Sequence, residues 1–348
     1  MLFHGRFRKI VFRAFRVGFV TILAFLAIVV LAVFYFSYFL PKPGKINYGV
    51  NFSPYYAKEE LGLNWKDTYI SMLDDLGAKN LRLVAYWNRI ESFPDVYDFS
   101  DLDWQLEEAE KRGANVILTI GRKVPRWPEC FEPAWALSGG EEYIKVRLLK
   151  YLSILVERYR ENSIIKYWQV ENEPFFPFGE CLNLIQDKNF LEEEINFVRA
   201  LDTKKREVIV QDSGEGGYWP VTYGLGDYLA ISMYRRILFD FWILPKEIYF
   251  KYPLPSWSYR AKARLFGISP SKIIVTELQA EPWGFKPLIS LTKKERDLTM
   301  DEERFKETIT YAQNTGISSL YFWGAEWWYW EKQNGNSFYW NTARDLFN

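Results

Sequence analysis

The segment "KYWQVENEPFF", residues 166–176, reads as a short buried strand that ends in carboxylates. Its apolar residues fit a strand of mixed burial, and Pro174 prevents ladder pairing beyond the strand end. Glu171 and Glu173 lie at that end with an Asn between them. Buried carboxylates are costly unless they are paired or take part in chemistry. The segment therefore indicates either an ion-pair partner for a buried arginine or a functional site.

Apolar runs of similar length recur along the chain and alternate with amphipathic helical stretches. The expected strands are residues 46–52, 80–86, 115–121, 165–170, 207–213, 228–234, 272–278 and 319–325. One helical stretch is expected to have Ser100 as its N-cap and to close at Gly113. Eight strand-helix units predict parallel strands in a closed (β/α)8 TIM barrel. An open doubly wound sheet is the alternative, but no GxGxxG motif follows the first strand and the sequence contains no Walker motif.

The fifth and sixth units depart from this pattern. Only residues 214–226 separate the fifth and sixth strands, and an aromatic-rich insert, residues 236–267, follows the sixth. The insert is interpreted in three ways, as a lid over a cleft, as an amphipathic patch on a bilayer, or as ordinary packing beneath a long loop. The sequence leaves these three open.

The N-terminus combines a basic flank with a long uncharged apolar run. The run, residues 17–40, is long enough to cross a hydrocarbon layer of about 30 Å. By the positive-inside rule, we expect a cytoplasmic tail at 1–16, a single transmembrane signal anchor in the cell membrane at 17–40, a linker at 41–45 and an extracytoplasmic barrel at 46–348. A cleavable signal peptide is the alternative, but the run exceeds the roughly 7 to 15 residues typical of one and no small-residue cleavage pattern follows.

The composition excludes several kinds of chemistry and partner. The five Lys or Arg of the first 40 residues face no Asp or Glu there, so the rest of the chain has a net charge of −5, which is not typical of a nucleic-acid-binding protein. The single histidine, His4, lies in the tail and cannot serve a Ser-His-Asp triad or a His-based zinc site. Acid-base work therefore falls to carboxylates, Lys or Tyr.

The chain has two cysteines, which are too few and too widely spaced for a zinc knuckle. Cys130 lies in the loop after the third expected strand and Cys181 in the loop after the fourth. Adjacent loops on an exported domain make a disulfide the hypothesis, with two free thiols as the alternative.

The active site of a (β/α)8 barrel lies at the carboxyl ends of its strands. Glu173 ends the fourth strand and Glu277 ends the seventh, in "IIVTELQAEPW", where Glu281 is a rival. Two carboxyl groups facing each other across a barrel mouth meet the requirement for glycoside hydrolysis.

These motifs resemble those of the retaining glycoside hydrolases of clan A, the 4/7 superfamily, and are similar to families 5, 39 and 42. "WQVENEPFF" resembles the fourth-strand motif, which implies that Glu173 is the acid/base and that Asn172 contacts the sugar 2-hydroxyl. "VTEL" resembles the seventh-strand motif, which implies that Glu277 is the nucleophile. Glu171 is a departure, because relatives often have a neutral residue there.

Three further matches follow in the same order along the chain. "NLRLVAYWNRIESFPDVYDFSDLD" is similar to the second-strand region, which implies that Arg82 braces the nucleophile. "AISMYRR" implies that Tyr234 donates a hydrogen bond to the nucleophile, and "YFWGAEWW" implies that Trp323 forms the floor of a sugar subsite. Trp87 is a further candidate for sugar stacking, although both tryptophans also fit core positions.

The sequence thus predicts a membrane-anchored, extracytoplasmic retaining glycoside hydrolase that acts on β-linked poly- or oligosaccharide. A transglycosidase and a catalytically silent carbohydrate-binding barrel are the alternatives. The mechanism that the resemblance implies needs no metal or organic cofactor. The expected partners are the saccharide and the lipid bilayer, and nucleic acid is excluded.

Overall fold

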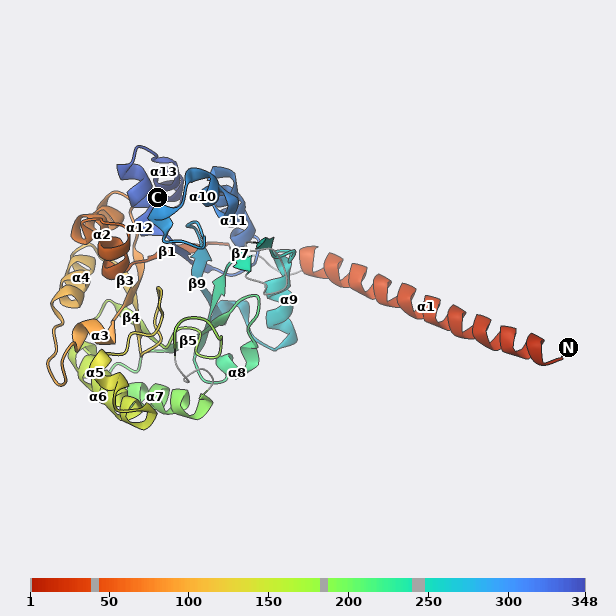
Figure 1. The fold of residues 1–348 in the computed structure, drawn as a ribbon, viewed down its shortest axis with the longest axis horizontal. Helices are drawn as coiled ribbons and strands as arrows, with labels where there is room; N and C mark the ends of the chain where they lie inside the picture. Colours follow the sequence, from red (N-terminus) through yellow and green to blue (C-terminus); the bar gives the residue numbers. More distant parts are fainter. Residues whose placement is uncertain (1, 39–43, 182–186, 240–247, 348) are drawn as a thin grey trace.

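The computed structural model describes residues 2–38, 44–181, 187–239 and 248–347. Its centre is a closed barrel of eight parallel strands in the order β1-β10-β9-β6-β5-β4-β3-β2 (Figure 1). The strands are β1 (Asn47–Asn51), β2 (Asn80–Val84), β3 (Asn115–Ile120), β4 (Ile165–Val170), β5 (Val208–Ser213), β6 (Tyr228–Met233), β9 (Ile273–Gln279) and β10 (Ser319–Trp323). The predicted TIM barrel is confirmed.

Helices surround the barrel and bury one face each against the strands. The longer ones are α2 (Trp65–Asp74), α4 (Ser100–Lys111), α6 (Glu141–Tyr159), α7 (Lys188–Leu201), α9 (Trp257–Leu265), α11 (Glu302–Gln313), α12 (Ala325–Gln333) and α13 (Phe338–Phe347). Shorter ones are α3 (Trp87–Ile90), α5 (Ala134–Leu137), α8 (Trp219–Tyr223) and α10 (Lys293–Thr299). In α6, Leu148, Tyr151, Leu152 and Leu155 are fully buried, and this spacing places them on one side of the helix.

The start of α4 differs from the expected one. Ser100 is the first helical residue, and Phe99 holds the N-cap position. Asp98 Oδ1 accepts the Ser100 backbone N–H at 2.9 Å. The Asp side chain therefore satisfies a free donor of the first turn. At the other end, Gly113 has a φ of 65°, as expected for the residue that closes a helix.

The irregular fifth and sixth units have simple structural forms. The only helix between β5 and β6 is α8, which has five residues. The insert after β6 contains an antiparallel hairpin, β7 (Arg236–Phe239) and β8 (Ile248–Lys251), followed by α9. Residues 240–247, most of the apolar part of the insert, lie outside the described residues, so its three interpretations stay open.

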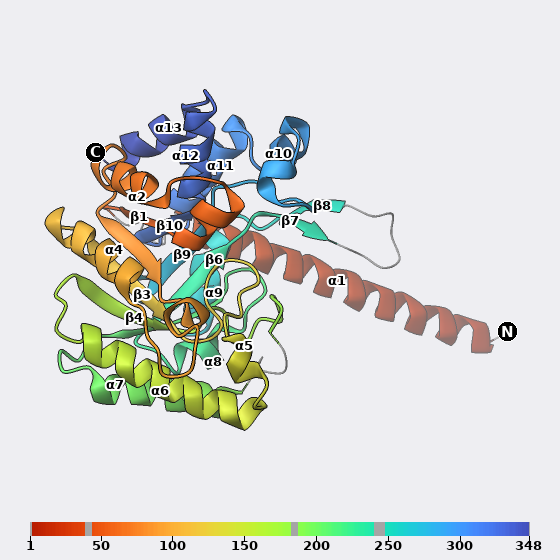
Figure 2. The ribbon, with the colours of Figure 1, turned by 60° about the vertical axis from the view of Figure 1, so that its left-hand side comes forward.

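The N-terminal helix α1 (Leu2–Tyr38) extends away from the barrel beside α9 (Figures 1 and 2). Its segment Phe15–Ala32 has a mean hydropathy of 2.5 and no buried residue. By length and composition it is apolar enough to cross a membrane, as either an anchor or a signal sequence. Residues 39–43, which include the end of the expected span and most of the linker, lie outside the described residues.

Candidate active site

A buried arginine organises the polar residues at the barrel mouth. Arg82 on β2 is fully buried, and its guanidinium group donates to five side chains from four other strands and the loop after β4. The acceptors are Gln169 Oε1 (2.9 Å), Asn51 Oδ1 (3.0 Å), Glu277 Oε1 (2.8 Å), Asn172 Oδ1 (2.7 Å) and Gln211 Oε1 (2.6 Å). Every one of them is an oxygen, and the Glu277 carboxylate compensates the charge of the arginine.

Glu277 lies near the carboxyl end of β9 and receives donors on both oxygens. Its Oε1 accepts from Arg82 at 2.8 Å and from Gln211 Nε2 at 2.9 Å, and its Oε2 accepts from the Tyr234 hydroxyl at 3.0 Å. Burial, followed by the Glu277 charge, raises the pKa of Tyr234 well above its usual value. The Tyr234 hydroxyl therefore stays protonated and donates a hydrogen bond to Glu277. These donors fix the carboxylate and complement its negative charge.

Glu173 lies in a different environment just past β4. Its Oε1 accepts from the Ser232 hydroxyl at 2.5 Å, and Ser232 pairs with Glu277 across β6 and β9. Burial, then the negative charges of Glu277 and Glu129, raise the pKa of Glu173 to about 8, although Lys123 and the Ser232 hydrogen bond oppose the rise. The carboxyl group is therefore protonated at neutral pH, and Ser232 binds Oε1 rather than Oε2.

The backbone just after β4 is strained at two of its glutamates. Glu171 has a φ of 60° and Glu173 a φ of 46°, values that residues with a side chain rarely adopt. Between them, Asn172 is fully buried, and its amide nitrogen has no partner among the described residues. This nitrogen is free to donate a hydrogen bond to a ligand.

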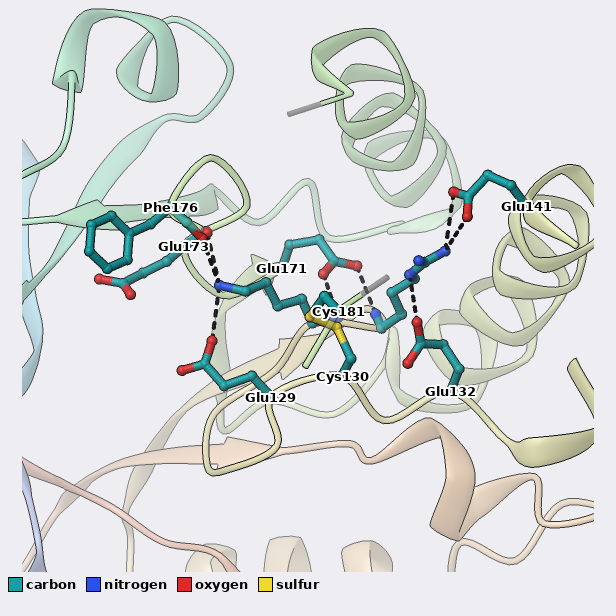
Figure 3. The surroundings of a disulfide bond; sticks show 10 residues. Glu129, Cys130, Glu132, Glu141, Glu171, Glu173, Phe176 and Cys181 are labelled. Carbon is teal, nitrogen blue, oxygen red and sulfur yellow. Dashed lines mark hydrogen bonds and ion pairs between the residues drawn. A yellow bond between two sulfur atoms is a disulfide. The ribbon is translucent and has the colours of Figure 1, made fainter. Parts of the chain in front are cut away.

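Glu171 has a structural role in this arrangement. Its two oxygens accept the backbone N–H groups of Arg122 (2.7 Å) and Lys123 (2.6 Å), and it also shares a hydrogen bond with Glu194 of α7. Burial raises the pKa of Glu171 to about 7. This carboxyl group therefore ties the loop after β3 to the end of β4 (Figure 3).

A lysine and a disulfide hold the same two loops together. Lys123 Nζ is 2.9 Å from Glu129 Oε2 and donates to the Glu173 carbonyl oxygen at 3.0 Å. Cys130 and Cys181 form a disulfide with their Cα atoms 5.2 Å apart, next to Glu129 (Figure 3). The loop that carries Glu173 is thus fixed from the β3 side.

Trp323, at the end of β10, is close to an ion-pair cluster. The Arg126 guanidinium lies 4.2 Å from the centre of its ring and pairs with Glu281 Oε1 (2.5 Å) and Glu326 Oε2 (2.8 Å). Glu281, the rival candidate for the nucleophile, therefore forms an ion pair with Arg126, whereas Arg82 pairs with Glu277. The Trp323 side chain retains a small exposed edge.

Trp87 does not join the site. It lies in α3, is fully buried, stacks on Tyr151 with ring centres 5.7 Å apart and donates to Glu91 Oε2 at 2.7 Å. The interpretation of Trp87 as a sugar-stacking residue is wrong for this structure, because the helix turns its ring into the core.

Several site residues were not singled out from the sequence. They are Asn51, Lys123, Glu129, Gln169, Gln211 and Ser232. For the residues on strands, the available signal was a polar residue inside an otherwise apolar run, as in "IKYWQV" and "EVIVQDS". Among the described residues, no group of three or more His, Cys, Asp or Glu could hold a metal ion.

Comparison with known protein sequences finds a distant and partial match. No model of a known protein family matches the chain. The β-galactosidase BgaA of Clostridium cellulovorans is 25% identical over 201 residues, which are 51% of this chain and 29% of that relative, so the chain spans less than a third of its length.

Solved structures give broader matches. Xylanase 10B of Thermotoga petrophila RKU-1, in complex with xylobiose, has a TM-score of 0.52 at 16% identity, covering 80% of this chain and 82% of that one. A GH5_18 enzyme of Bifidobacterium longum subsp. longum, in complex with Manβ1-4GlcNAc, has a TM-score of 0.56 at 11% identity, covering 80% and 68%. The chain shares the barrel fold of these glycoside hydrolases, in agreement with the clan A motifs.

Proposed function

We propose that this protein is a retaining glycoside hydrolase that acts on β-linked oligo- or polysaccharide, with Glu277 as nucleophile and Glu173 as acid/base. The observation that carries the proposal is the contrast between the two carboxyl groups. Glu277 receives three hydrogen bonds from Arg82, Gln211 and Tyr234, whereas Glu173 is buried with a pKa of about 8. One group suits attack as an anion and the other suits proton donation.

In the first step, a Glu277 oxygen attacks the anomeric carbon while the bond from that carbon to the leaving oxygen breaks. The proton of Glu173 passes to the leaving oxygen, so the leaving sugar departs as a neutral alcohol. The products of this step are a glycosyl ester on Glu277 and an ionised Glu173.

In the second step, Glu173 accepts a proton from water while the water oxygen attacks the anomeric carbon. The bond to Glu277 breaks, which returns Glu277 as a carboxylate and Glu173 as an acid. Because the anomeric carbon is inverted twice, the product keeps the β configuration.

Two further residues are assigned to the sugar. The unpaired amide nitrogen of Asn172 would donate to the hydroxyl next to the anomeric carbon, and the Trp323 ring would support the sugar from below. Both assignments follow from the clan A motifs and from the positions of these residues, Asn172 beside Arg82 and Trp323 beside Arg126.

The silent-barrel alternative does not explain this arrangement. A protein that only binds sugar gains nothing from a buried carboxyl group with a raised pKa beside a second carboxylate, since both cost stability. Transfer to a sugar acceptor uses the same first step and differs only in what attacks the glycosyl ester.

The helix α1 would place this activity at a membrane surface. We propose that it is an uncleaved anchor with the N-terminus in the cytoplasm and the barrel outside. The support is the exposed apolar segment Phe15–Ala32 after a basic flank.

The proposal is tested with the full chain in detergent, assayed against aryl β-glycosides, β-glucans, mannans, xylans and galactans. Wild type is expected to cleave at least one of them, and Glu173→Gln and Glu277→Gln to lose at least a hundredfold on polysaccharide. Glu142→Gln, whose side chain is 90% exposed in α6, is the matched control and should keep its activity. Equal activity of wild type and both site variants would refute the assignment.

A further inference from the structure

Trp127 is an exposed tryptophan in a turn of the loop after β3. Trp127 is 56% exposed, while its neighbours Arg126 and Glu129 are 4% and 7% exposed. The turn is closed by the Glu129 backbone N–H, which donates to the Arg126 carbonyl at 2.7 Å. Arg126 has a φ of 83° and Glu129 a φ of 70°, so the backbone accepts strain on both sides of the tryptophan.

Side chains fix this turn in several directions. Arg126 pairs with Glu281 after β9, and Glu129 pairs with Lys123. Directly beyond the turn, the disulfide of Cys130 joins it to the loop after β4 (Figure 3). An exposed apolar ring costs solvation, and a strained, anchored turn that presents one points to a binding role.

The tryptophan is the outer member of a row of aromatic rings that leads down to the nucleophile. Its ring centre lies 5.8 Å from that of Phe178, which lies 5.9 Å from that of Trp283. Trp283 stacks on Tyr234 with centres 5.0 Å apart, and the Tyr234 hydroxyl contacts Glu277. The four rings come from the loops after β3, β4 and β9 and from the end of β6, so the row crosses one side of the barrel mouth.

The row lies on the side of the acid/base. Phe178 follows Glu173 on the same loop, and the turn with Trp127 is tied to that loop by the disulfide. Trp323 lies at the end of β10, next to Arg126. In the reaction proposed above, the oxygen that takes the proton of Glu173 belongs to the leaving sugar, so the rings near Glu173 flank the leaving part of the substrate.

We propose that Trp127, Phe178 and Trp283 form the binding site for the leaving sugar of a β-linked oligosaccharide. The C–H faces of a β-linked sugar are apolar and flat enough to pack on aromatic rings. This inference rests on the proposed glycoside hydrolase function and adds that the substrate has at least one sugar residue beyond the bond that is cleaved. The disulfide positions two of the three rings.

The test compares two substrates of the sugar that wild type hydrolyses fastest, its β-linked trisaccharide and its β-glycosyl fluoride. The fluoride reports on the nucleophile and the glycosyl sugar but carries no leaving sugar. In the full chain, Trp127→Ala is expected to lower the ratio of kcat/KM for trisaccharide over fluoride about tenfold, mainly through KM, because one stacking contact is lost. Trp127→Phe should restore most of the ratio.

Phe93→Ala is the matched control, because Phe93 is a 69% exposed aromatic residue in the loop after α3, outside the aromatic row. Its ratio should equal that of wild type. An unaltered ratio for Trp127→Ala, or equal loss on both substrates, would overturn the leaving-sugar site while leaving the hydrolase function intact. If wild type cleaved neither substrate, the proposed function would fall and this inference with it.

Discussion

At the residue scale, Glu173 and Glu277 differ in what surrounds their oxygens. Burial and two neighbouring carboxylates raise the pKa of Glu173 to about 8, while Arg82, Gln211 and Tyr234 donate to Glu277. In the proposed mechanism, the same type of side chain thereby serves two chemical roles within one barrel mouth.

The raised pKa of Glu173 predicts an alkaline limit of activity. Since the acid/base must begin protonated, kcat/KM on a substrate with a poor leaving group should fall above about pH 8. Ser232→Ala removes a hydrogen bond that lowers this pKa and should move the limit to higher pH. Glu129→Gln removes a negative charge that raises it and should move the limit to lower pH.

Measured pH profiles of the three proteins check these opposite shifts. The Glu142→Gln variant serves as the control, because this side chain is exposed on α6. Shifts in the same direction for both site variants, or a limit that stays at the same pH, would show that Glu173 is not the titrating acid.

Sequence reasoning singled out the two candidate carboxylates, and the resemblance also implied the contacts of Arg82 and Tyr234 with Glu277 that the structure shows. Glu173 and Glu277 could be singled out because each follows an apolar run and lies in a recognisable motif. Gln211 and Ser232 could not, because their roles depend on which strand faces which across the barrel. Trp87 shows the limit most clearly, since a flat ring near a strand end says nothing of the direction in which a short helix turns it.

At the element scale, the loops after β3 and β4 are built as one unit. Glu171 binds the backbone of the first loop, Lys123 binds the Glu173 carbonyl, and the disulfide closes the pair. Glu173, the proposed acid/base, and Trp127 both lie on this unit, so the proposal connects its stability with its function.

Removal of the disulfide should therefore affect both properties. Cys130 and Cys181 are 51 residues apart, and closing a loop of that length stabilises the folded state by about 4 kcal/mol in the chain-entropy estimate. The double variant Cys130→Ser/Cys181→Ser should lower the free energy of unfolding by roughly 2–4 kcal/mol and weaken trisaccharide hydrolysis more than fluoride hydrolysis.

Urea denaturation and the two-substrate assay measure these effects. Wild type in reducing buffer is the matched comparison and should behave as the double variant does. Full stability without the disulfide would contradict its structural role, and an unaltered substrate ratio would show that the rings hold their positions without it.

Elements were predictable where the hydrophobic pattern was regular. All eight barrel strands appear within two residues of the expected ranges, because a buried parallel strand is a nearly continuous apolar run. The hairpin β7/β8 was not predicted, since its antiparallel pairing lies outside the barrel and depends on a long insert. Ser100 is not the N-cap because the helix begins one residue earlier than expected, with Phe99 at the N-cap position and the Ser100 N–H bound by Asp98.

At the scale of the whole molecule, the barrel and α1 differ in whether their apolar residues are buried. The barrel buries a continuous core, whereas the apolar segment of α1 is exposed along its length. Such a segment requires a bilayer, a micelle or removal by cleavage. The sequence predicts the span from the length of the apolar run, and the helix is long and apolar enough for it.

We expect the full chain, expressed in cells, to remain with the membrane pellet after washes with high salt and alkaline carbonate. N-terminal sequencing of the mature protein should begin at the start of the chain. Release into the supernatant, or a mature N-terminus beyond residue 30, would show that the segment is a cleaved signal.

The buried carboxyl groups also predict how stability varies with pH. The pKa values of Glu129, Glu171 and Glu215 are raised to about 7 and that of Glu173 to about 8, all from 4.5 and chiefly by burial. Between pH 4.5 and 8 the folded state therefore holds more protons than the unfolded state, and the free energy of unfolding falls as pH rises.

Urea midpoints at pH 5.5 and 8.5 measure this loss. Glu173→Gln cannot ionise at this position and should lose less stability than wild type over the same interval. Carboxyl groups with a pKa lowered to about 2, such as those of Glu295 and Glu307, titrate below this interval and do not contribute. A stability that rises from pH 5.5 to 8.5 would contradict the burial of these four acids in their protonated form.

The central claim is that Glu277 forms a covalent bond with the sugar. The most direct measurement uses a 2-deoxy-2-fluoro-β-glycoside of the sugar that the protein cleaves, since the fluorine slows breakdown of the glycosyl ester, followed by mass spectrometry of the digested protein. The account predicts one added glycosyl group on the peptide that contains "IIVTELQAEPW", at Glu277, with activity lost in parallel. Labelling at Glu281, or turnover with an inverted product and no labelled carboxylate, would contradict it.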